Sequence, residues 1–393
     1  MSGQLVKRGE RKWLVRVPLG RDANGGRRTY HNATVNGTKK DAERYLHAAL
    51  AKRDLGTLLE PARVSLGEYL DQWLDEAARP RIRSRTYADY RFLIDRYLRP
   101  RLGAHRFDRL APVDVQTLVN ALGEDGLSPK TVRHAHGVLL SALNQAMRWG
   151  MLTRNVAALV ELPRLRPREL RALSTAEADR FRVAVHGTRF EALFLLLLGT
   201  GMRPSEALGL AWTDLDLEAG RATVRRVLPR DQKTGGGAPR FEEPKTARSR
   251  RVVPLSPSVV RALVAHRKRQ AAEKLEAGPV YVDHGLVFAS LTGGPLDERN
   301  VVHRHFKPAV KRAKLDEQPE GEASEAKRPP LRLYDLRHTH VTLSLRAGEP
   351  VHVVSARVGH ASARMTLDVY AHALPADQAD ASARLEAVLF GRG

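Results

Sequence analysis

Cysteine does not occur anywhere in the 393 residues. The chain can therefore have no disulfide, no thiolate nucleophile and no zinc site with cysteine ligands, which excludes the Cys/His finger modules and several enzyme classes. Long apolar runs are missing too. The longest, Ala192 to Leu198, is far too short to cross a bilayer, and the N-terminal sequence MSGQLVKRGE lacks the apolar stretch of a signal peptide. We expect a cytoplasmic protein with no membrane partner.

Acidic residues are scarce relative to basic ones. The sequence has 66 Lys and Arg against 44 Asp and Glu, a formal net charge of +22. A protein this basic usually binds a polyanion, and nucleic acid is the first candidate. The length also exceeds what one ordinary hydrophobic core organises, so two or three domains are expected.

The first 60 residues predict a small basic domain, with 13 Lys and Arg against 6 Asp and Glu. Residues 12–17 and 27–35 alternate between apolar and polar side chains as strands do, with a glycine-rich turn at 20–26 between them. Thr38 then offers an N-cap for a helix whose apolar residues recur at spacings of three and four. The basic side chains could form only a solvated face, but their density favours contact with nucleic acid.

Residues 56–63 are typical of a linker, and residues 65–160 predict an all-helical domain. Ser65 and Glu68 form the pattern of a capping box, and Ser128 followed by proline begins a later helix. Basic side chains crowd the helix starts, where backbone amides also favour phosphate, so this domain is a candidate DNA clamp. Each of them could also be an ordinary solvated cation. The residues concerned are Arg81, Arg83, Arg85, Lys130 and Arg133.

A second linker is predicted at 161–173, since two prolines and four arginines occur in residues 161–171 without a periodic apolar face. The third domain, 174–393, opens with the capping-box pair Ser174 and Glu177. Its pattern predicts helices to about residue 211, strands within 222–255, and then helices again. An acidic stretch between Lys314 and Lys327 predicts a surface loop.

Arg203 and Lys245 are the first candidates for chemistry in this domain. Arg203 stands between a helix that ends at glycine and Pro204, which starts the next helix, so its guanidinium lies beside free amides and could bind phosphate. Glu206, one turn on, could hold it, although a purely structural Arg–Glu pair explains these residues equally well. Lys245 falls at the turn between two strands predicted in 241–255, where its ammonium could reach a leaving-group oxygen. Most such lysines are merely solvated.

Further candidates lie near the C-terminus. Arg337 falls where a helical core begins, and a buried arginine needs an anion. His338 and His340 stand two apart on a helix and share no face, so they suit a metal poorly. His360 follows a glycine turn, and Tyr370 lies on a short helix late in the chain, where it would more often be a packing residue than a nucleophile.

The order of these residues resembles a known family. TGMRPSEALGL around Arg203, DLRHTHVTLSL around Arg337, and VGHASARMTLDVYAH, with ten residues from His360 to Tyr370, are similar to the catalytic motifs of the tyrosine recombinase (phage integrase) family. Lys245 in PKTARSRR resembles the family's hairpin lysine. The likeness covers essentially the whole chain.

The resemblance implies a multidomain fold that is mainly α with small β-sheets. It implies an N-terminal three-stranded sheet plus helix as an arm-type DNA-binding domain (1–60). A helical, SAM-like core-binding domain (65–160), the linker 161–173 and a mixed α+β catalytic domain (174–393) would follow. The implied partners are double-stranded DNA attachment sites and a homotetramer on that DNA, at the bacterial nucleoid. A directionality factor or a host architectural protein is a further candidate.

A reaction is implied as well. Arg203 and Arg337 would hold the nonbridging oxygens of a phosphodiester, and Tyr370 would attack it to form a 3′-phosphotyrosyl link. Lys245 would protonate the departing 5′ oxygen, and His360 would assist at the phosphate or take up the tyrosine proton. This chemistry needs no metal or other cofactor. The segment from Asp380 to Phe390 would suit docking onto a neighbouring protomer, or packing on its own domain.

Tyr334 departs from the family's pattern, which usually has histidine three residues before the second arginine. A phenol can donate a hydrogen bond to phosphate, but with a pKa near 10 it is a poor proton acceptor at neutral pH. The role of Tyr334 as a site residue is therefore open.

Three other functions fit these residues less well. A type IB topoisomerase would use similar chemistry, but the separate front domain disfavours it. A DNA-binding regulator without catalysis is disfavoured because all five signature residues are present. A metal nuclease is disfavoured because no cluster of acidic residues falls near the arginines.

Overall fold

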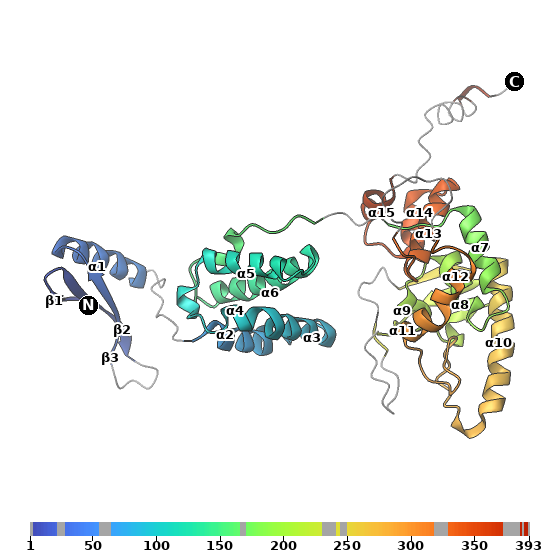
Figure 1. The fold of residues 1–393 in the computed structure, drawn as a ribbon, viewed down its shortest axis with the longest axis horizontal. Coiled ribbons are helices and arrows are strands. Elements are labelled where there is room, and N and C mark those ends of the chain that lie inside the picture. The colour runs from blue at the N-terminus through green and yellow to red at the C-terminus, as the bar shows by residue number, and fades with distance from the viewer. Residues whose placement is uncertain are drawn as a thin grey trace. The chain divides into compact units, whose positions relative to one another are not determined.

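The computed structural model describes residues 3–21, 28–54, 64–165, 170–229, 241–243, 250–317, 329–371, 386 and 389–391. The chain divides into two compact units, residues 1–167 and 168–393, which are described separately. The described residues are mainly helical with small antiparallel sheets, which confirms the predicted fold class (Figure 1). The domain limits proposed inside these units stay predictions.

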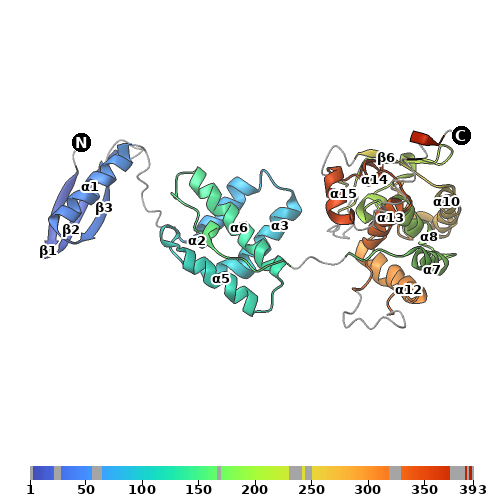
Figure 2. The same ribbon diagram turned by 90° about the horizontal axis from the view of Figure 1, so that it is seen from above.

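The first unit opens with an antiparallel sheet in the order β1-β2-β3. One helix, α1, lies along it (Figure 2). Val15 and Val17 of the central strand point toward Ala42, Leu46 and Ala49 of the helix, and all five are buried. Thr38 caps the helix as predicted, because its hydroxyl accepts from the Asp41 amide at 3.3 Å. The elements are β1 (Gln4–Gly9), β2 (Lys12–Arg21), β3 (Arg28–Asn36) and α1 (Lys39–Asp54).

Residues 64–160 of the same unit are helical, as predicted, with a core of their own. The capping box of Ser65 and Glu68 is present, and Ser128 caps the longest helix of this part, α6. Tyr69 is fully buried and donates a hydrogen bond to the Ala142 carbonyl at 2.6 Å. The elements are α2 (Leu66–Gln72), α3 (Ser84–Leu93), α4 (Arg99–Leu102), α5 (Pro112–Glu124) and α6 (Pro129–Arg148). Two π-helical segments (Trp73–Ala78 and Ile94–Leu98) and two 3-10 turns (Phe107–Arg109 and Val156–Leu159) complete them.

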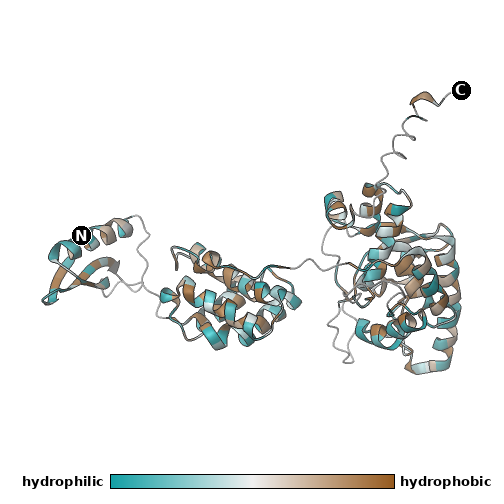
Figure 3. Cartoon of the chain, turned by 45° about the horizontal axis from the view of Figure 1, so that its top comes forward, coloured by the Kyte–Doolittle hydropathy of each residue, from teal (hydrophilic) through white to brown (hydrophobic). Residues whose placement is uncertain are grey.

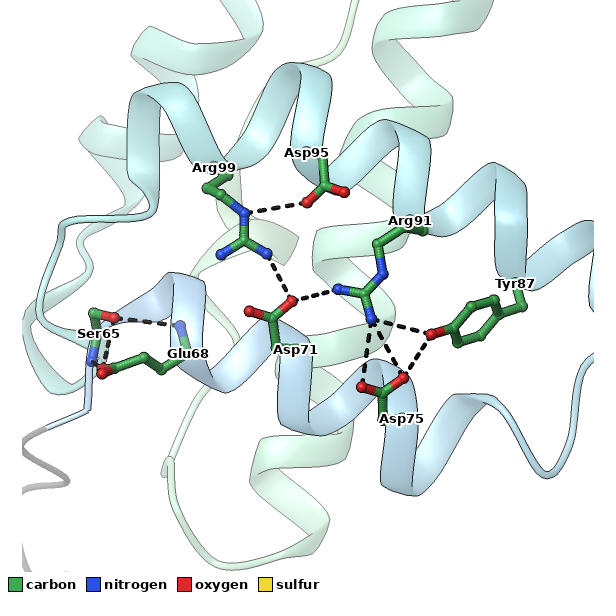
Figure 4. A network of polar contacts seen from close by, with 8 residues as sticks. All are labelled: Ser65, Glu68, Asp71, Asp75, Tyr87, Arg91, Asp95 and Arg99. Carbon is green, nitrogen blue, oxygen red and sulfur yellow. Dashed lines mark hydrogen bonds and ion pairs between the residues drawn. The ribbon is translucent and has the colours of Figure 1, made fainter.

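Figure 4 shows a polar network on this helical part, which we call the Asp71 network. Asp71 accepts from Arg91 at 2.5 Å and from Arg99 at 2.6 Å. Asp75 and Asp95 supply further acceptors to these two arginines at 3.1–3.4 Å. The arginines of α3 and α4 that lie in this network are therefore already paired inside the fold. Arg81, Arg85 and Lys130, which the sequence offered as phosphate contacts, are exposed.

The second unit is built around α8, whose sides are nearly all buried. Leu193, Phe194, Leu196 and Leu197 are each at most 1% exposed. This helix packs against α10 and α13. The helices are α7 (Thr175–Val185), α8 (Glu191–Thr200), α9 (Pro204–Ala207), α10 (Pro257–Ala277), α11 (Glu298–Val301), α12 (Lys307–Arg312), α13 (Asp335–Arg346), α14 (Val351–Val358) and α15 (Ala363–Tyr370). A π-helical segment (Val302–Phe306) and 3-10 turns (Trp212–Asp214 and Gly278–Val280) lie between them.

Strands occur in this unit as predicted, and they form a three-stranded antiparallel sheet in the order β4-β5-β6. Its strands are β4 (Leu215–Asp216), β5 (Arg221–Val224) and β6 (Arg251–Pro254), so the first strand begins earlier than the sequence indicated. Glu242 pairs with Val227 in an isolated bridge. The predicted turn that carries Lys245 lies outside the described residues.

Several other predictions also fall outside the described residues. They are the linker 56–63, most of the glycine-rich turn 20–26, the core of the acidic stretch, and nearly all of the segment from Asp380 to Phe390. Within the described part, no helix is both long and apolar enough to cross a membrane. The helices carry hydrophobic and hydrophilic residues side by side along their length (Figure 3).

Candidate active site

Arg203 is positioned by the turn between α8 and α9. The helix α8 ends at Thr200, and Gly201 follows in the left-handed conformation with φ of +64°. A Cβ at Gly201 would lie 2.7 Å from the His340 ring, so glycine is required here for two reasons. Pro204 begins α9 and leaves Arg203 as the residue that precedes the helix.

Glu206 is the anion at the centre of this region. It is 1% exposed, and its oxygens accept from the Arg203 amide at 2.9 Å and the Arg203 side chain at 2.7 Å. Arg251 of β6 donates to the same carboxylate at 2.9 and 3.2 Å. Burial alone would raise the pKa of Glu206, but the hydrogen bond and charge of Arg251 and the charge of Arg203 lower it overall. The Arg–Glu pair expected from the sequence therefore forms, and a second arginine completes it.

The guanidinium of Arg203 remains partly exposed although it is paired with Glu206. Its second terminal nitrogen donates to the Gly359 carbonyl at 3.2 Å, and 32% of its side chain is exposed. Arg251 is more deeply held, since its Nε donates to the Arg357 carbonyl at 2.6 Å and its side chain is 7% exposed. Arg203 is thus fixed in place and open to a ligand, whereas Arg251 is a buried support.

Arg337 occupies the first turn of α13 and is 1% exposed. One terminal nitrogen donates to the Gly201 carbonyl at 2.7 Å. The other is buried and has no hydrogen-bond partner among the described residues. Burial and the nearby charge of Arg203 lower the pKa of Arg337 to about 10. A buried guanidinium with a free donor is the feature that an incoming anion would satisfy.

His360 and Tyr370 lie beside these arginines. The helix α14 ends at Val358, and His360 follows Gly359, with its Nδ1 2.7 Å from the hydroxyl of the buried Thr366. The His360 ring stacks on the Tyr370 ring with 6.3 Å between centroids. Burial, Arg337 and Arg203 lower the pKa of His360 to about 4, so it is neutral at pH 7.

Tyr370 ends α15 and is 2% exposed. It belongs to a small apolar cluster with Val341, Leu345, Val354 and Val358, which joins α13, α14 and α15. Burial raises its pKa, and the charge of Arg337 opposes that rise. Tyr370 is therefore a packing residue and, at the same time, a phenol next to the arginines.

His338 is a residue whose place in the site the sequence reasoning missed. Its sequence position suggests only a poorly suited metal ligand, yet its Nδ1 lies 2.5 Å from the Tyr370 hydroxyl. Tyr334 precedes it by one helical turn, with 5.3 Å between the two ring centroids. The one available signal was this spacing of four, which places residues 334 and 338 on the same helix face. Arg251 was missed as well, and nothing in its pattern singled it out from the neighbouring basic residues.

The structure brings Arg203, Arg337, His360 and Tyr370 together and places Tyr334 at the edge of the same group. Lys245 lies outside the described residues. We call Arg203, Arg251, Arg337 and Glu206 the Glu206 cluster. Its three guanidinium groups exceed its single carboxylate by two positive charges, so it suits an oxyanion such as phosphate. Among the described residues, no group of three or more His, Asp or Glu could hold a metal ion.

Comparisons with known proteins identify the family of the chain. Residues 163–377 match the phage integrase family, and residues 65–123 match the family described as phage integrase, N-terminal SAM-like domain. A tyrosine recombinase XerC-like protein from Caldanaerobacter subterraneus is 30% identical over 391 residues, 96% of each chain.

Solved structures show the same fold. The Tn1549 transposon integrase in complex with a circular intermediate DNA superposes with a TM-score of 0.65 at 23% identity, covering 83% of this chain and 99% of that one. A lambda integrase tetramer bound to a Holliday junction gives 0.58 at 17% identity, covering 95% and 96%.

Proposed function

The chain belongs to the phage integrase family and is a tyrosine recombinase, and we propose that Arg203, Lys245, Arg337, His360 and Tyr370 carry out its DNA strand exchange. The observation that supports this most is the buried nitrogen of Arg337 that has no partner among the described residues. It lies in a cluster with excess positive charge, close enough to Tyr370 to affect its pKa.

The reaction follows from the charges. A phosphodiester carries one negative charge and gains more as a fifth oxygen approaches, so cations must be fixed where that charge develops. Arg337 would donate its free N–H to one nonbridging oxygen, and Arg203 would contact the phosphate from its exposed side. Tyr370 would attack phosphorus to form a 3′-phosphotyrosyl link, and Lys245 would protonate the 5′ oxygen. His360 would assist at the phosphate or take up the tyrosine proton.

Arg251 and Glu206 would act as positioning residues. Glu206 holds the Arg203 backbone and side chain together, and Arg251 fixes Glu206 from β6. A guanidinium that is already held in position loses little conformational entropy when the phosphate binds. Such support therefore favours stabilisation of a charged transition state.

The substrate we propose is duplex DNA at the ends of a mobile element. The likeness to a transposon integrase that was solved with circular intermediate DNA supports this. Joining two DNA segments requires four cleavages, so a tetramer on DNA is proposed, in line with the tetramer named for the lambda integrase. Residues 1–60 would bind arm sites and residues 65–160 core sites. A directionality factor and a location at the bacterial nucleoid complete the proposal.

Replacing Tyr370 by phenylalanine tests the central claim. Tyr370→Phe removes the nucleophilic oxygen and keeps the ring in its apolar cluster, so the variant should bind DNA and form no covalent complex. A nicked suicide site resolved on a denaturing gel measures this. A covalent band that persists in the variant would place the nucleophile elsewhere.

A further inference from the structure

We propose that His338 is the base that removes the proton of Tyr370, an inference that rests on the proposed role of Tyr370 as nucleophile. His338 is the fourth residue of α13. Its Nδ1 lies 2.5 Å from the Tyr370 hydroxyl oxygen, with the ring centroids 5.7 Å apart. In the described part of the chain, this is the hydrogen bond that the hydroxyl makes. For His338 to take the phenol proton, its Nδ1 must be the acceptor of this hydrogen bond and its own proton must be on Nε2.

The other nearby histidine is poorly placed for this role. His360 lies face to face with Tyr370, since the ring planes differ by 14°, and such stacking directs ring faces rather than nitrogens toward the partner. Its Nδ1 is bonded to Thr366 at 2.7 Å. His360 therefore packs against the phenol, whereas His338 binds its oxygen. This favours His360 at the phosphate and His338 at the nucleophile.

His338 also supplies an imidazole close to position 334, where this chain has tyrosine and the family usually has histidine. Residues four apart on an α-helix lie on the same face, and the Tyr334 and His338 rings meet edge to face at 5.3 Å. A phenol at 334 with an ordinary pKa near 10 would not take a proton at neutral pH. The imidazole that does so lies one turn further along the same face of α13.

The surroundings keep His338 in the neutral form that a base needs. Burial, Arg332 and Arg337 lower its pKa, and Asp335 opposes them, so the ring is neutral at pH 7. A protonated His338 would stand close to two arginines and would return its proton readily, as a reversible strand exchange requires. The groups that face the pair are Arg332, Tyr334, Asp335, Arg337 and His360.

The O–H bond of Tyr370 breaks and its proton moves to Nδ1 of His338, while the phenolic oxygen forms a bond to phosphorus. The bond from phosphorus to the 5′ oxygen breaks, and that oxygen takes a proton from the proposed acid, Lys245. In rejoining, a 5′ hydroxyl returns its proton to Lys245 and attacks phosphorus. The bond from phosphorus to the phenolic oxygen breaks, and the His338 imidazolium returns its proton to Tyr370.

The test is His338→Gln, which keeps a hydrogen-bond acceptor for the phenol and removes the base. Single-turnover cleavage of a nicked suicide site at saturating DNA should fall on the order of a hundredfold or more at pH 7. The deficit should shrink as pH rises, because the phenol then ionises without help. His352→Gln, the same change at an exposed histidine of α14, should keep the parental rate and pH profile.

Two further measurements separate a base from a structural residue. A DNA site with sulfur in place of the bridging 5′ oxygen has a leaving group that needs no proton, so His338→Gln should stay slow on it. A more acidic fluorotyrosine placed at position 370 should restore part of the rate of His338→Gln, which a misfolded site could not do.

Three outcomes would overturn the inference. One is a parental rate and pH profile in His338→Gln, and another is full rescue by the sulfur site, which would make His338 an acid. The third is no gain from either high pH or fluorotyrosine, which would make it structural. A covalent complex in Tyr370→Phe would instead contradict the proposed function itself, so the two failures are distinguishable.

Discussion

The first and second units each contain an arginine network, and the networks differ in which charge is in excess. In the Asp71 network, Arg91 and Arg99 face the three carboxylates of Asp71, Asp75 and Asp95 (Figure 4). In the Glu206 cluster, Arg203 and Arg251 share one carboxylate, and Arg337 adds a third guanidinium near it. Arginine and carboxylate side chains therefore form a fully paired structural network in the first unit. In the second unit they leave positive charge available for an anion.

The direction of the arginine pKa shifts expresses this difference. A hydrogen bond to Tyr87, together with Asp71 and Asp75, raises the pKa of Arg91, and hydrogen bonds to Asp71 and Asp95 raise that of Arg99. Burial and Arg203 lower the pKa of Arg337 to about 10. An arginine whose surroundings favour its charge needs no ligand, whereas one whose surroundings oppose it gains most from an arriving anion.

The largest expected effect is on catalysis. Arg203→Ala should slow single-turnover cleavage about a hundredfold or more, by analogy with the loss of an oxyanion donor, because developing charge on the phosphate would lose a fixed cation. DNA affinity should change far less, because many other cations contact the backbone. Arg91→Ala, from the closed network, should keep the cleavage rate once DNA is saturating. If Arg203→Ala lost affinity and kept its rate, the comparison between the networks would fail.

A smaller effect is expected on stability from Glu206→Gln. Arg203 and Arg251 would then lack their shared carboxylate, and removing one partner of a buried ion pair costs about 3 kcal/mol or more. Amide hydrogen exchange in peptides of α9 and β6 measures it by region. Glu218→Gln, an exposed glutamate of the same unit, is the matched control and should show no change.

The pH dependence of this loss has a definite sign. The folded pKa of Glu206 lies below its unfolded value, so its contribution is full above about pH 4.3 and is lost as the pH falls through the lower folded pKa. The gap between parent and Glu206→Gln should therefore be constant near neutral pH and close below about pH 4. A gap that widened in acid would mean that Glu206 is not ionised in the fold.

The Asp71 network should respond more weakly. Asp71→Asn removes the carboxylate shared by Arg91 and Arg99, but these side chains are partly exposed, so the loss should be about 1 kcal/mol. Hydrogen exchange in α2 and α4 would report it, with cleavage at saturating DNA unaffected. Asp89→Asn, in a looser exposed pair with Arg85 at 3.9 Å, is the control. A cleavage defect in Asp71→Asn would show that this network also serves the reaction.

The smallest expected effect is none at all. If arginine and lysine supply the positive charge at the phosphate, cleavage should proceed in EDTA at the rate seen with magnesium. A requirement for a divalent ion in the cleavage step would contradict the proposed role of the Glu206 cluster.

DNA binding, in contrast to cleavage in EDTA, should respond to ions. Raising the salt concentration should weaken it steeply, because each neutralised phosphate releases counterion.

Local sequence patterns predicted the starts of several helices correctly. Ser65, Ser128 and Ser174 cap helices as expected, since a hydroxyl before an apolar stripe acts within one turn. The Arg203–Glu206 pair is equally local, being three residues apart. The early start of the second sheet at Leu215 was not predicted, because a strand of two residues has no periodicity to detect.

The missed residues depend on contacts between distant segments. Arg251 reaches Glu206 across 45 residues, and His338 reaches Tyr370 across 32. No spacing rule links such positions, because tertiary packing brings them together. For His338 and Tyr370, this is the packing of α13, α14 and α15 around one apolar cluster. The proposed roles of the signature residues came from resemblance, whereas the His338 contact appears only in three dimensions.

Two glycine carbonyls, which are neutral acceptors, help to hold Arg203 and Arg337 in addition to the carboxylate of Glu206. The carbonyl of Gly201 binds Arg337 and that of Gly359 binds Arg203, each just beyond the last turn of a helix. A carboxylate in either place would cancel the charge it fixed, but a peptide oxygen orients a guanidinium and leaves its full charge for the DNA phosphate. A peptide oxygen also cannot be removed by changing a side chain. A laboratory search for recombinases with new target sites should therefore keep both left-handed glycines as well as Glu206 and Arg251.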